Sequence, residues 1–215
     1  GLAEKEALLL AQNSFMSSES KLRDQVIYMA QMQLRLDDYR DELVDWLKQH
    51  RHFDAAMDLN SRGVAHARLF DQHALALYPM RIEEQGLYAV LNAEAFTDFW
   101  AHEAAVRYQL RGQPKRLTVD LQLATYRCVC SAFALLSECN PQQYTVKTRV
   151  WRAGGKRGIA VFVTAKPTTV VHHSRSGLLA AMELEGRIKA HGGAVRRRHL
   201  NRIVMLLSEP EDLNL

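Results

Sequence analysis

Leu121-Gln-Leu-Ala-Thr-Tyr-Arg-Cys-Val-Cys-Ser-Ala-Phe-Ala-Leu-Leu136 is the stretch on which the fold of this chain depends. Apolar residues recur in it at helical spacing, which predicts an apolar helix. The pattern stops at Asn140-Pro141, because proline cannot continue a helix and also restricts the residue before it. This helix opens a region that continues to Glu209 and carries most of the fold signals.

Strand and helix signals alternate after this helix. Gly154-Gly155 lies between two segments of alternating apolar residues, which predicts a tight β-hairpin turn. A second helical pattern ends at Gly192-Gly193, where glycine suits the left-handed conformation that follows a helix. We therefore expect strands over residues 144–151 and 159–163, a helix over 178–190, and strands over 194–198 and 202–207.

The N-terminal part carries an apolar heptad repeat, which predicts one long helix of roughly 60 Å. A second helical pattern covers residues 54–77 and stops at Tyr78-Pro79. Two antiparallel helices cannot bury both apolar faces alone, so we expect a homodimer whose two hairpins form a four-helix bundle. The heptad positions expected at that dimer interface are Leu8, Phe15, Leu22, Met29, Leu36 and Leu43.

Framework residues support one family resemblance. Tyr126-Arg127 on the first predicted helix, Gly192-Gly193 after the second, and the linker Leu77-Tyr-Pro-Met-Arg-Ile-Glu-Glu-Gln-Gly-Leu87 resemble bacterial sensor histidine kinases of the NarX/UhpB-like subtype. The resemblance implies an α+β fold, with a helical dimerisation hairpin over residues 1–80. A two-layer α/β sandwich of the GHKL (Bergerat) ATPase-like type would then occupy residues 81–215.

The same resemblance implies a first helix of the sandwich over residues 86–100. An edge strand over residues 104–110 would follow it. Both expectations come from the position of the linker and not from an independent periodicity.

Positions that carry chemistry in this family look degenerate here. Ser131 stands where the family has a catalytic Glu, and Leu135 stands where it has the Asn that holds magnesium. Lys166 lies where an acidic-glycine motif should follow the strand, and only Gly177 remains of a glycine-rich lid. Leucine offers no hard oxygen ligand for magnesium. We therefore expect a degenerate nucleotide site and no cofactor.

The family's phosphoacceptor histidine falls on Val26, and no histidine precedes His50. The resemblance therefore implies a non-catalytic histidine-kinase-like module that is not an enzyme. It would signal through dimerisation and contacts with a response regulator, a kinase or another signalling protein. The alternative is a phosphotransfer protein that exchanges phosphoryl groups with a response regulator without ATP, using His50 or His52, or on the second helix His66 or His73.

Composition sets the remaining expectations. The chain has 215 residues, 47% apolar and 24% charged, as in ordinary globular proteins. No apolar run approaches the roughly 20 residues of a membrane span. We expect a cytoplasmic location, either alone or as the cytoplasmic part of a membrane-anchored protein with a sensor domain before Gly1.

The three cysteines, Cys128, Cys130 and Cys139, are expected to be reduced core thiols. A zinc site that combines cysteines with His172 and His173 is the alternative, and the Cys-x-Cys spacing on a helix disfavours it because the two thiols point apart.

Basic residues cluster at Lys156-Arg157 and at Arg196-Arg-Arg-His199 with Arg202. They suggest a phosphate-binding patch, but alternate residues of a strand face opposite sides, so protection of a sheet edge is the preferred interpretation. The net charge is only +4, and the three tryptophans are scattered along the sequence. We therefore expect no nucleic-acid partner.

Overall fold

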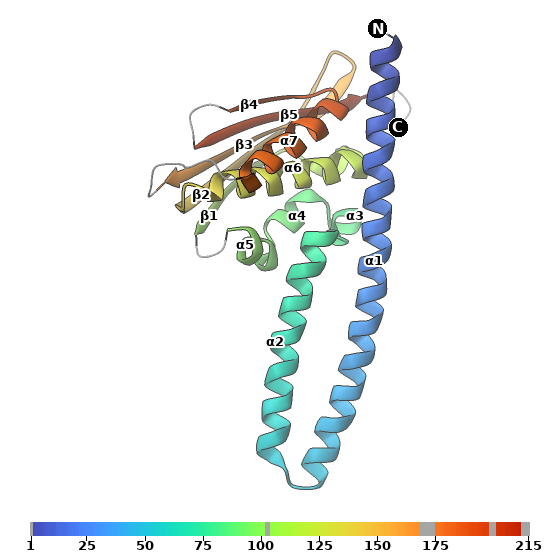
Figure 1. Ribbon diagram of the computed structural model, residues 1–215, viewed down its shortest axis with the longest axis vertical. Coiled ribbons are helices and arrows are strands. Elements are labelled where there is room, and N and C mark those ends of the chain that lie inside the picture. Colours follow the sequence, from blue (N-terminus) through green and yellow to red (C-terminus); the bar gives the residue numbers. More distant parts are fainter. Residues whose placement is uncertain (1, 102–103, 168–174, 198–200, 212–215) are drawn as a thin grey trace. The chain divides into compact units, whose positions relative to one another are not determined.

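The computed structural model describes residues 2–101, 104–167, 175–197 and 201–211. Its helices and strands belong to two compact units. One unit is residues 18–80, and the other combines residues 1–17 with residues 81–215. Figure 1 labels the elements, and each unit is described in turn.

The first unit is a helical hairpin. It contains most of α1 (Leu2–Gln49) and all of α2 (Phe53–Leu77), as the heptad pattern and the Tyr78-Pro79 stop predict. Arg51 takes a φ of 62° in the turn, and the backbone N–H of His52 donates to the carbonyl of Leu47 at 2.8 Å. The turn is therefore closed by the main chain itself.

The second unit contains a five-stranded sheet in the order β1-β2-β3-β5-β4. β1 pairs in parallel with β2, and every other pair is antiparallel. β1 and β4 are therefore the two edge strands. The strands are β1 (Ala105–Arg111), β2 (Pro141–Ala153), β3 (Lys156–Pro167), β4 (Ala194–Arg197) and β5 (Arg202–Pro210).

Glycines make two turns of this unit in the way that the sequence predicts. Gly154 and Gly155 have φ angles of 60° and 68°, which both central residues of a type I′ hairpin turn require. Gly192 has a φ of 59° after helix α7 (Arg175–Ala190), and the Gly193 N–H donates to the Ile188 carbonyl at 3.0 Å. That bond closes a Schellman motif at the end of α7.

Helix α6 (Val119–Ser137) is the centre of the core. Thr118 caps it by accepting a hydrogen bond from the Leu121 N–H at 3.2 Å. The Phe133 ring lies 5.6 Å from that of Phe96 and 4.4 Å from that of Tyr144. Aromatic packing therefore joins α6 to α5 (Glu94–Trp100) on one side and to β2 on the other.

The expectation that no apolar run approaches the length of a membrane span is wrong for α6: by length and composition alone it could cross a membrane, and it is the one helix of the described residues for which this holds. However, 78% of its most apolar window is buried inside the fold. Packing in the core accounts for that apolar composition.

The segment between the hairpin and β1 differs from the expected single helix over residues 86–100. It forms α3 (Arg81–Gln85), α4 (Leu87–Leu91) and α5. Gly86 has a φ of 85°, and the chain is extended at Ala93. These breaks let α4 bury Leu87, Val90 and Leu91 while α5 places Phe96 in the aromatic cluster.

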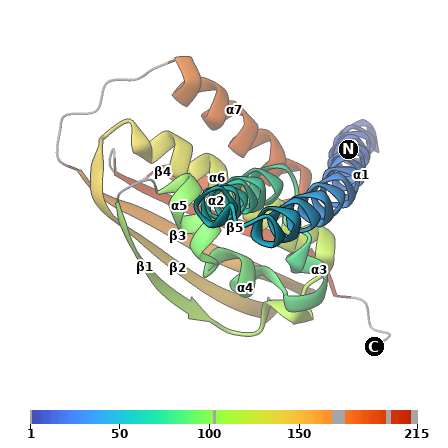
Figure 2. The ribbon, with the colours of Figure 1, turned by 90° about the horizontal axis from the view of Figure 1, so that it is seen from below.

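All the helices of the sandwich lie on one face of the sheet (Figures 1 and 2). Buried side chains alternate along the central strands, as one covered face requires. The opposite face, which we call the open face, carries half-buried and exposed side chains. The residues on the covered face are Tyr144, Val146 and Thr148 of β2, Ile159, Val161 and Val163 of β3, and Ile203, Met205 and Leu207 of β5. The predicted fold class, a long helical hairpin followed by a two-layer α/β sandwich, is confirmed.

Candidate functional site

The degenerate nucleotide positions on α6 lie on the side of this helix that meets α7. Cys128, Ser131, Leu135 and Glu138 follow one another at intervals of three or four residues, so they share one face of α6. Arg187 and Glu183 of α7 are close enough to affect the pKa of Cys128. One end of this face therefore lies beside the C-terminal half of α7.

The other end of the same face lies beside the start of α7. A Cβ at Gly177 would collide with the carboxylate of Glu138 in its present position, so the start of α7 lies close to Glu138. Ser131 and Leu135 lie between the two ends and are 8% and 4% exposed. The interface between α6 and α7 thus encloses both positions.

Three of the four residues assigned to the degenerate site therefore come together at one helix–helix interface. The fourth, Lys166, has an exposed side chain near the end of β3. His172 and His173 lie outside the described residues. The loss of nucleotide binding stays a prediction, and the burial of Ser131 and Leu135 gives it a physical reason.

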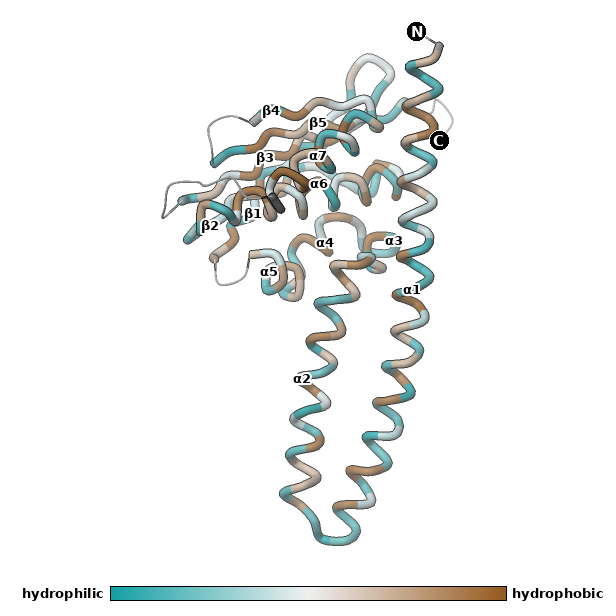
Figure 3. The backbone as a smooth tube through the Cα atoms, viewed as in Figure 1, coloured by the Kyte–Doolittle hydropathy of each residue, from teal (hydrophilic) through white to brown (hydrophobic). Residues whose placement is uncertain are grey.

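The hairpin exposes a row of large apolar side chains on α1. Leu36 and Leu43, both predicted at the dimer interface, are 60% and 49% exposed. Met32, Tyr39 and Trp46 are also exposed, and the five residues follow one another at intervals of four and three. This spacing places all five on one side of the helix. We call this row the apolar stripe: Met32, Leu36, Tyr39, Leu43 and Trp46. Apolar residues recur along both helices of the hairpin in Figure 3.

The other predicted interface residues have different surroundings. Leu22 and Met29 are half-buried, as are Leu8 and Phe15. The Arg187 guanidinium of α7 lies over the Phe15 ring at 4.7 Å from its centroid. Phe15 therefore contacts the sandwich unit to which residues 1–17 belong, and the apolar stripe begins further along α1.

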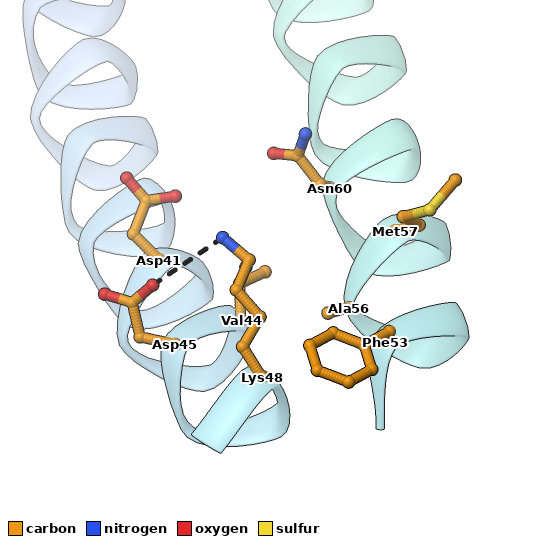
Figure 4. A pocket seen from close by; sticks show the side chains of 8 residues that line it. All are labelled: Asp41, Val44, Asp45, Lys48, Phe53, Ala56, Met57 and Asn60. Atoms are coloured by element: carbon orange, nitrogen blue, oxygen red, sulfur yellow. Dashed lines mark ion pairs between the residues drawn. The ribbon is translucent and has the colours of Figure 1, made fainter. Parts of the chain in front are cut away.

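A cavity of about 430 Å³ lies between α1 and α2 near the turn of the hairpin. Val44 and Ala56 form its buried floor, and the Phe53 ring points into the space between the helices (Figure 4). Lys48 pairs with Asp45 at 3.8 Å on the α1 side. The two helices therefore leave an open pocket between them at this end of the hairpin.

The two candidate phosphoacceptors lie at the turn of the hairpin. The His50 ring stacks on Trp46 with centroids 4.1 Å apart, and its Nδ1 lies 2.8 Å from the Trp46 carbonyl oxygen. His52 is exposed and precedes α2. Both rings are accessible, and Val26, where the family's histidine would stand, is buried at 3% exposure.

The three cysteines are buried and free. Burial raises the pKa of both the Cys128 and the Cys130 thiols to about 12. Within the described part of the chain, no three His, Cys, Asp or Glu side chains gather in a way that could hold a metal ion.

Buried thiols of this kind should resist alkylation. At pH 8 we expect iodoacetamide to label Cys128 and Cys130 at least about 100-fold more slowly in the folded protein than in urea, because the reactive thiolate is both rare and inaccessible. The same raised pKa makes stability depend on pH. The full free energy of unfolding is present below the unfolded thiol pKa of about 8.5, and it decreases as pH rises from 8.5 toward the folded pKa of about 12. Mass spectrometry of labelled peptides measures the rates, and equally fast labelling in both states would contradict the buried assignment.

No protein-family model and no curated protein sequence matches this chain. A solved structure that resembles it is the histidine kinase domain of the blue-light activated histidine kinase from Erythrobacter litoralis EL346. The sequence identity is 14%, the TM-score is 0.42, and the alignment covers 81% of this chain and 94% of that one. A similarity of this size indicates neither family membership nor an activity.

Sequence reasoning missed Phe53, the first residue of α2 and part of its apolar pattern. Phe53, Met57 and Val64 are 59%, 70% and 65% exposed, and their spacing of four and seven places them on one side of α2. The expected start of this helix at residue 54 excluded Phe53. Extending the pattern by one residue would have added Phe53, which with Met57 and Val64 forms the apolar row of α2.

Proposed function

We propose that this protein is a non-catalytic, histidine-kinase-like signalling module that acts as a homodimer through protein–protein contacts. The observation that carries the proposal is the apolar stripe of α1, whose five large side chains are 40–70% exposed in one copy of the chain. A second hairpin is the partner that fits best, because an identical stripe and the apolar row of α2 would cover it symmetrically.

Energetics and packing both support a second copy as the partner. Burying the exposed part of each large apolar side chain gives roughly 1 kcal/mol at about 25 cal/mol per Å². Summed over both rows of two hairpins, this is comparable to or larger than the association cost of about 4–15 kcal/mol. The cavity of about 430 Å³ beside Val44 and Ala56 would also receive side chains from a partner hairpin.

The non-catalytic part of the proposal rests on the interface between α6 and α7. A nucleotide needs backbone N–H groups for its phosphates, and its magnesium needs oxygen ligands. The Leu135 side chain supplies no such ligand, and Ser131 is buried with it. A signal would then pass through a change in the packing of the helical bundle, which a response regulator, kinase or other signalling partner would bias.

Sedimentation equilibrium of the unmodified protein tests this proposal. At about 10 μM we expect a single species of twice the chain mass, 24.5 kDa per chain. A monomer that persists to about 100 μM would refute it.

A phosphotransfer protein is the alternative, and the geometry of His50 favours it over the other histidines. If Nδ1 donates its hydrogen to the Trp46 carbonyl, the lone pair of Nε2 is left for a phosphoryl group. Incubation with a radiolabelled, phosphorylated response regulator separates the two functions. Acid-labile label that is lost in His50→Gln but kept in His66→Gln would favour phosphotransfer, and no label in the unmodified protein would exclude it.

A further inference from the structure

The open face of the sheet brings together basic residues that are far apart in the sequence. On this face, the strand register places Arg107, Thr145, Thr164 and Arg202 in one row across four strands. The next row runs Gln109, Lys147, Phe162, Val204 and Arg196 across all five strands. The third row runs Arg111, Arg149, Ala160, Leu206 and Ala194.

Six cations therefore share one surface, which we call the basic face. Every one of these side chains is exposed. None of them forms an ion pair with any carboxylate of the described residues. The basic face consists of Arg107 and Arg111 of β1, Lys147 and Arg149 of β2, Arg196 of β4 and Arg202 of β5.

The strands bring almost no negative charge to this surface. The sequences of β1, β2, β3 and β4 contain no Asp or Glu, and β5 contains only Glu209. Glu209 falls on the covered side of the alternation, where it accepts a hydrogen bond from Arg157 at 2.6 Å. The strands thus contribute only positive charge to the basic face, although the net charge of the chain is only +4.

An aromatic ring lies in the middle of these cations. Phe162 stands between Lys147 and Val204 in the second row, and the Arg202 guanidinium lies 5.9 Å from its ring centroid. Trp151, on the same side of β2, covers Gly158, where any Cβ would collide with the indole. Between the cations, the neighbouring residues Ala160, Thr145 and Thr164 have small or β-branched side chains and are half-buried.

We propose that the basic face binds single-stranded nucleic acid, with its cations on the phosphates and Phe162 stacked against a base. Five strands at about 4.8 Å spacing spread the cations over roughly 19 Å in one direction, and four residues of β1 spread them over about 13 Å in the other. A single phosphate would occupy a small part of that area. A chain of three or four nucleotides matches it.

Chemistry favours a nucleic acid over the other polyanions. Five of the six cations are arginines, whose planar guanidinium groups bind phosphate with two hydrogen bonds and stack on bases. An exposed sheet with a central aromatic and basic surroundings is a known way of holding unpaired bases. An anionic membrane would need protruding apolar side chains, and among the described residues of this face Leu206, at 41% exposure, is the one large apolar residue that is exposed.

This inference does not depend on the proposed signalling function, and it departs from the sequence-level expectation of no nucleic-acid partner. That expectation rested on basic residues that are adjacent in the sequence. The cations of the basic face come from different strands, and the strand register places them on one surface.

Fluorescence anisotropy with a labelled 12-nucleotide single-stranded RNA tests the proposal on the full chain. At 50 mM salt we expect a Kd on the order of 1–10 μM, and with about four phosphates in contact it should weaken roughly 50-fold at 200 mM salt. Lys147→Glu with Arg149→Glu should weaken binding at least tenfold. Arg116→Glu with Lys189→Glu, the same charge change at exposed sites of the helical layer, should change it less than twofold.

Phe162→Leu separates base stacking from charge, because it removes the ring and keeps an apolar side chain. We expect roughly fivefold weaker RNA binding and unchanged heparin binding in this variant. A single-stranded DNA of the same sequence shows whether the 2′-hydroxyl of RNA contributes to affinity. Binding of either the RNA or the DNA at the basic face supports the proposal. No RNA or DNA binding at 50 mM salt, an equal effect of both charge-reversal pairs, or binding to phosphatidylserine vesicles in place of nucleic acid would overturn it.

Discussion

Replacing both Leu36 and Leu43 by glutamate is expected to convert the proposed dimer into a monomer. The two leucines are 60% and 49% exposed in one chain, so the substitutions leave the fold of that chain intact. In the proposed dimer they would place four carboxylates in an apolar seam, and each unpaired charge there costs several kcal/mol. We expect the dimer Kd to rise at least 1,000-fold.

Leu34→Glu is the matched control for this variant. Leu34 is 65% exposed on the same helix, and two residues from Leu36 correspond to a rotation of about 200°, which points it away from the stripe. Sedimentation equilibrium should show a dimer for this control and a monomer for the double variant. Lowering the pH to about 4 should partly restore the double variant, because protonated glutamates are cheaper to bury. Equal dimerisation of both variants would exclude the apolar stripe as the interface.

Restoring the family's polar residues at the α6–α7 interface should damage the fold. Leu135 is 4% exposed, so Leu135→Asn buries an amide and removes packing, which should lower the unfolding free energy by about 3 kcal/mol. Ser131→Glu should cost at least as much at pH 7. Burial raises the pKa of such a carboxyl, so the loss grows as pH rises above the unfolded value of about 4.3.

Leu178→Asn controls for the first of these changes, because Leu178 on α7 is 63% exposed and should respond by less than about 0.5 kcal/mol. Urea unfolding followed by circular dichroism measures all three variants. An unchanged free energy of unfolding in Leu135→Asn would mean that the interface between α6 and α7 opens easily. It would contradict the explanation that burial of Ser131 and Leu135 prevents nucleotide binding.

Local signals in the sequence predict most of the architecture. Gly154-Gly155 and Gly192 mark turns that need a positive φ, and only glycine meets that need without strain. Heptad spacing predicts α1 because apolar residues that recur every seven positions fall on one side of a helix. These are short-range requirements, and they can be recognised without knowing the tertiary contacts.

Long-range contacts decided what the sequence could not predict. The break at Ala93 depends on where Phe96 meets Phe133, and the two residues are far apart in the sequence. The contact between Phe15 and Arg187 likewise joins the two ends of the chain. The basic face depends on strand register, which no single strand specifies.

The central claim is that this histidine-kinase-like module has lost nucleotide binding, and a binding measurement tests it most directly. The measurement is the melting temperature of the full chain with and without 5 mM Mg-ATP. A site with a Kd of about 50 μM would stabilise the protein by about 2.7 kcal/mol at that concentration, which raises the melting temperature of a chain of this size by several degrees. We predict a change below about 0.5 °C, because Ser131 and Leu135 are enclosed between α6 and α7. A reproducible rise of several degrees that requires magnesium would contradict the account.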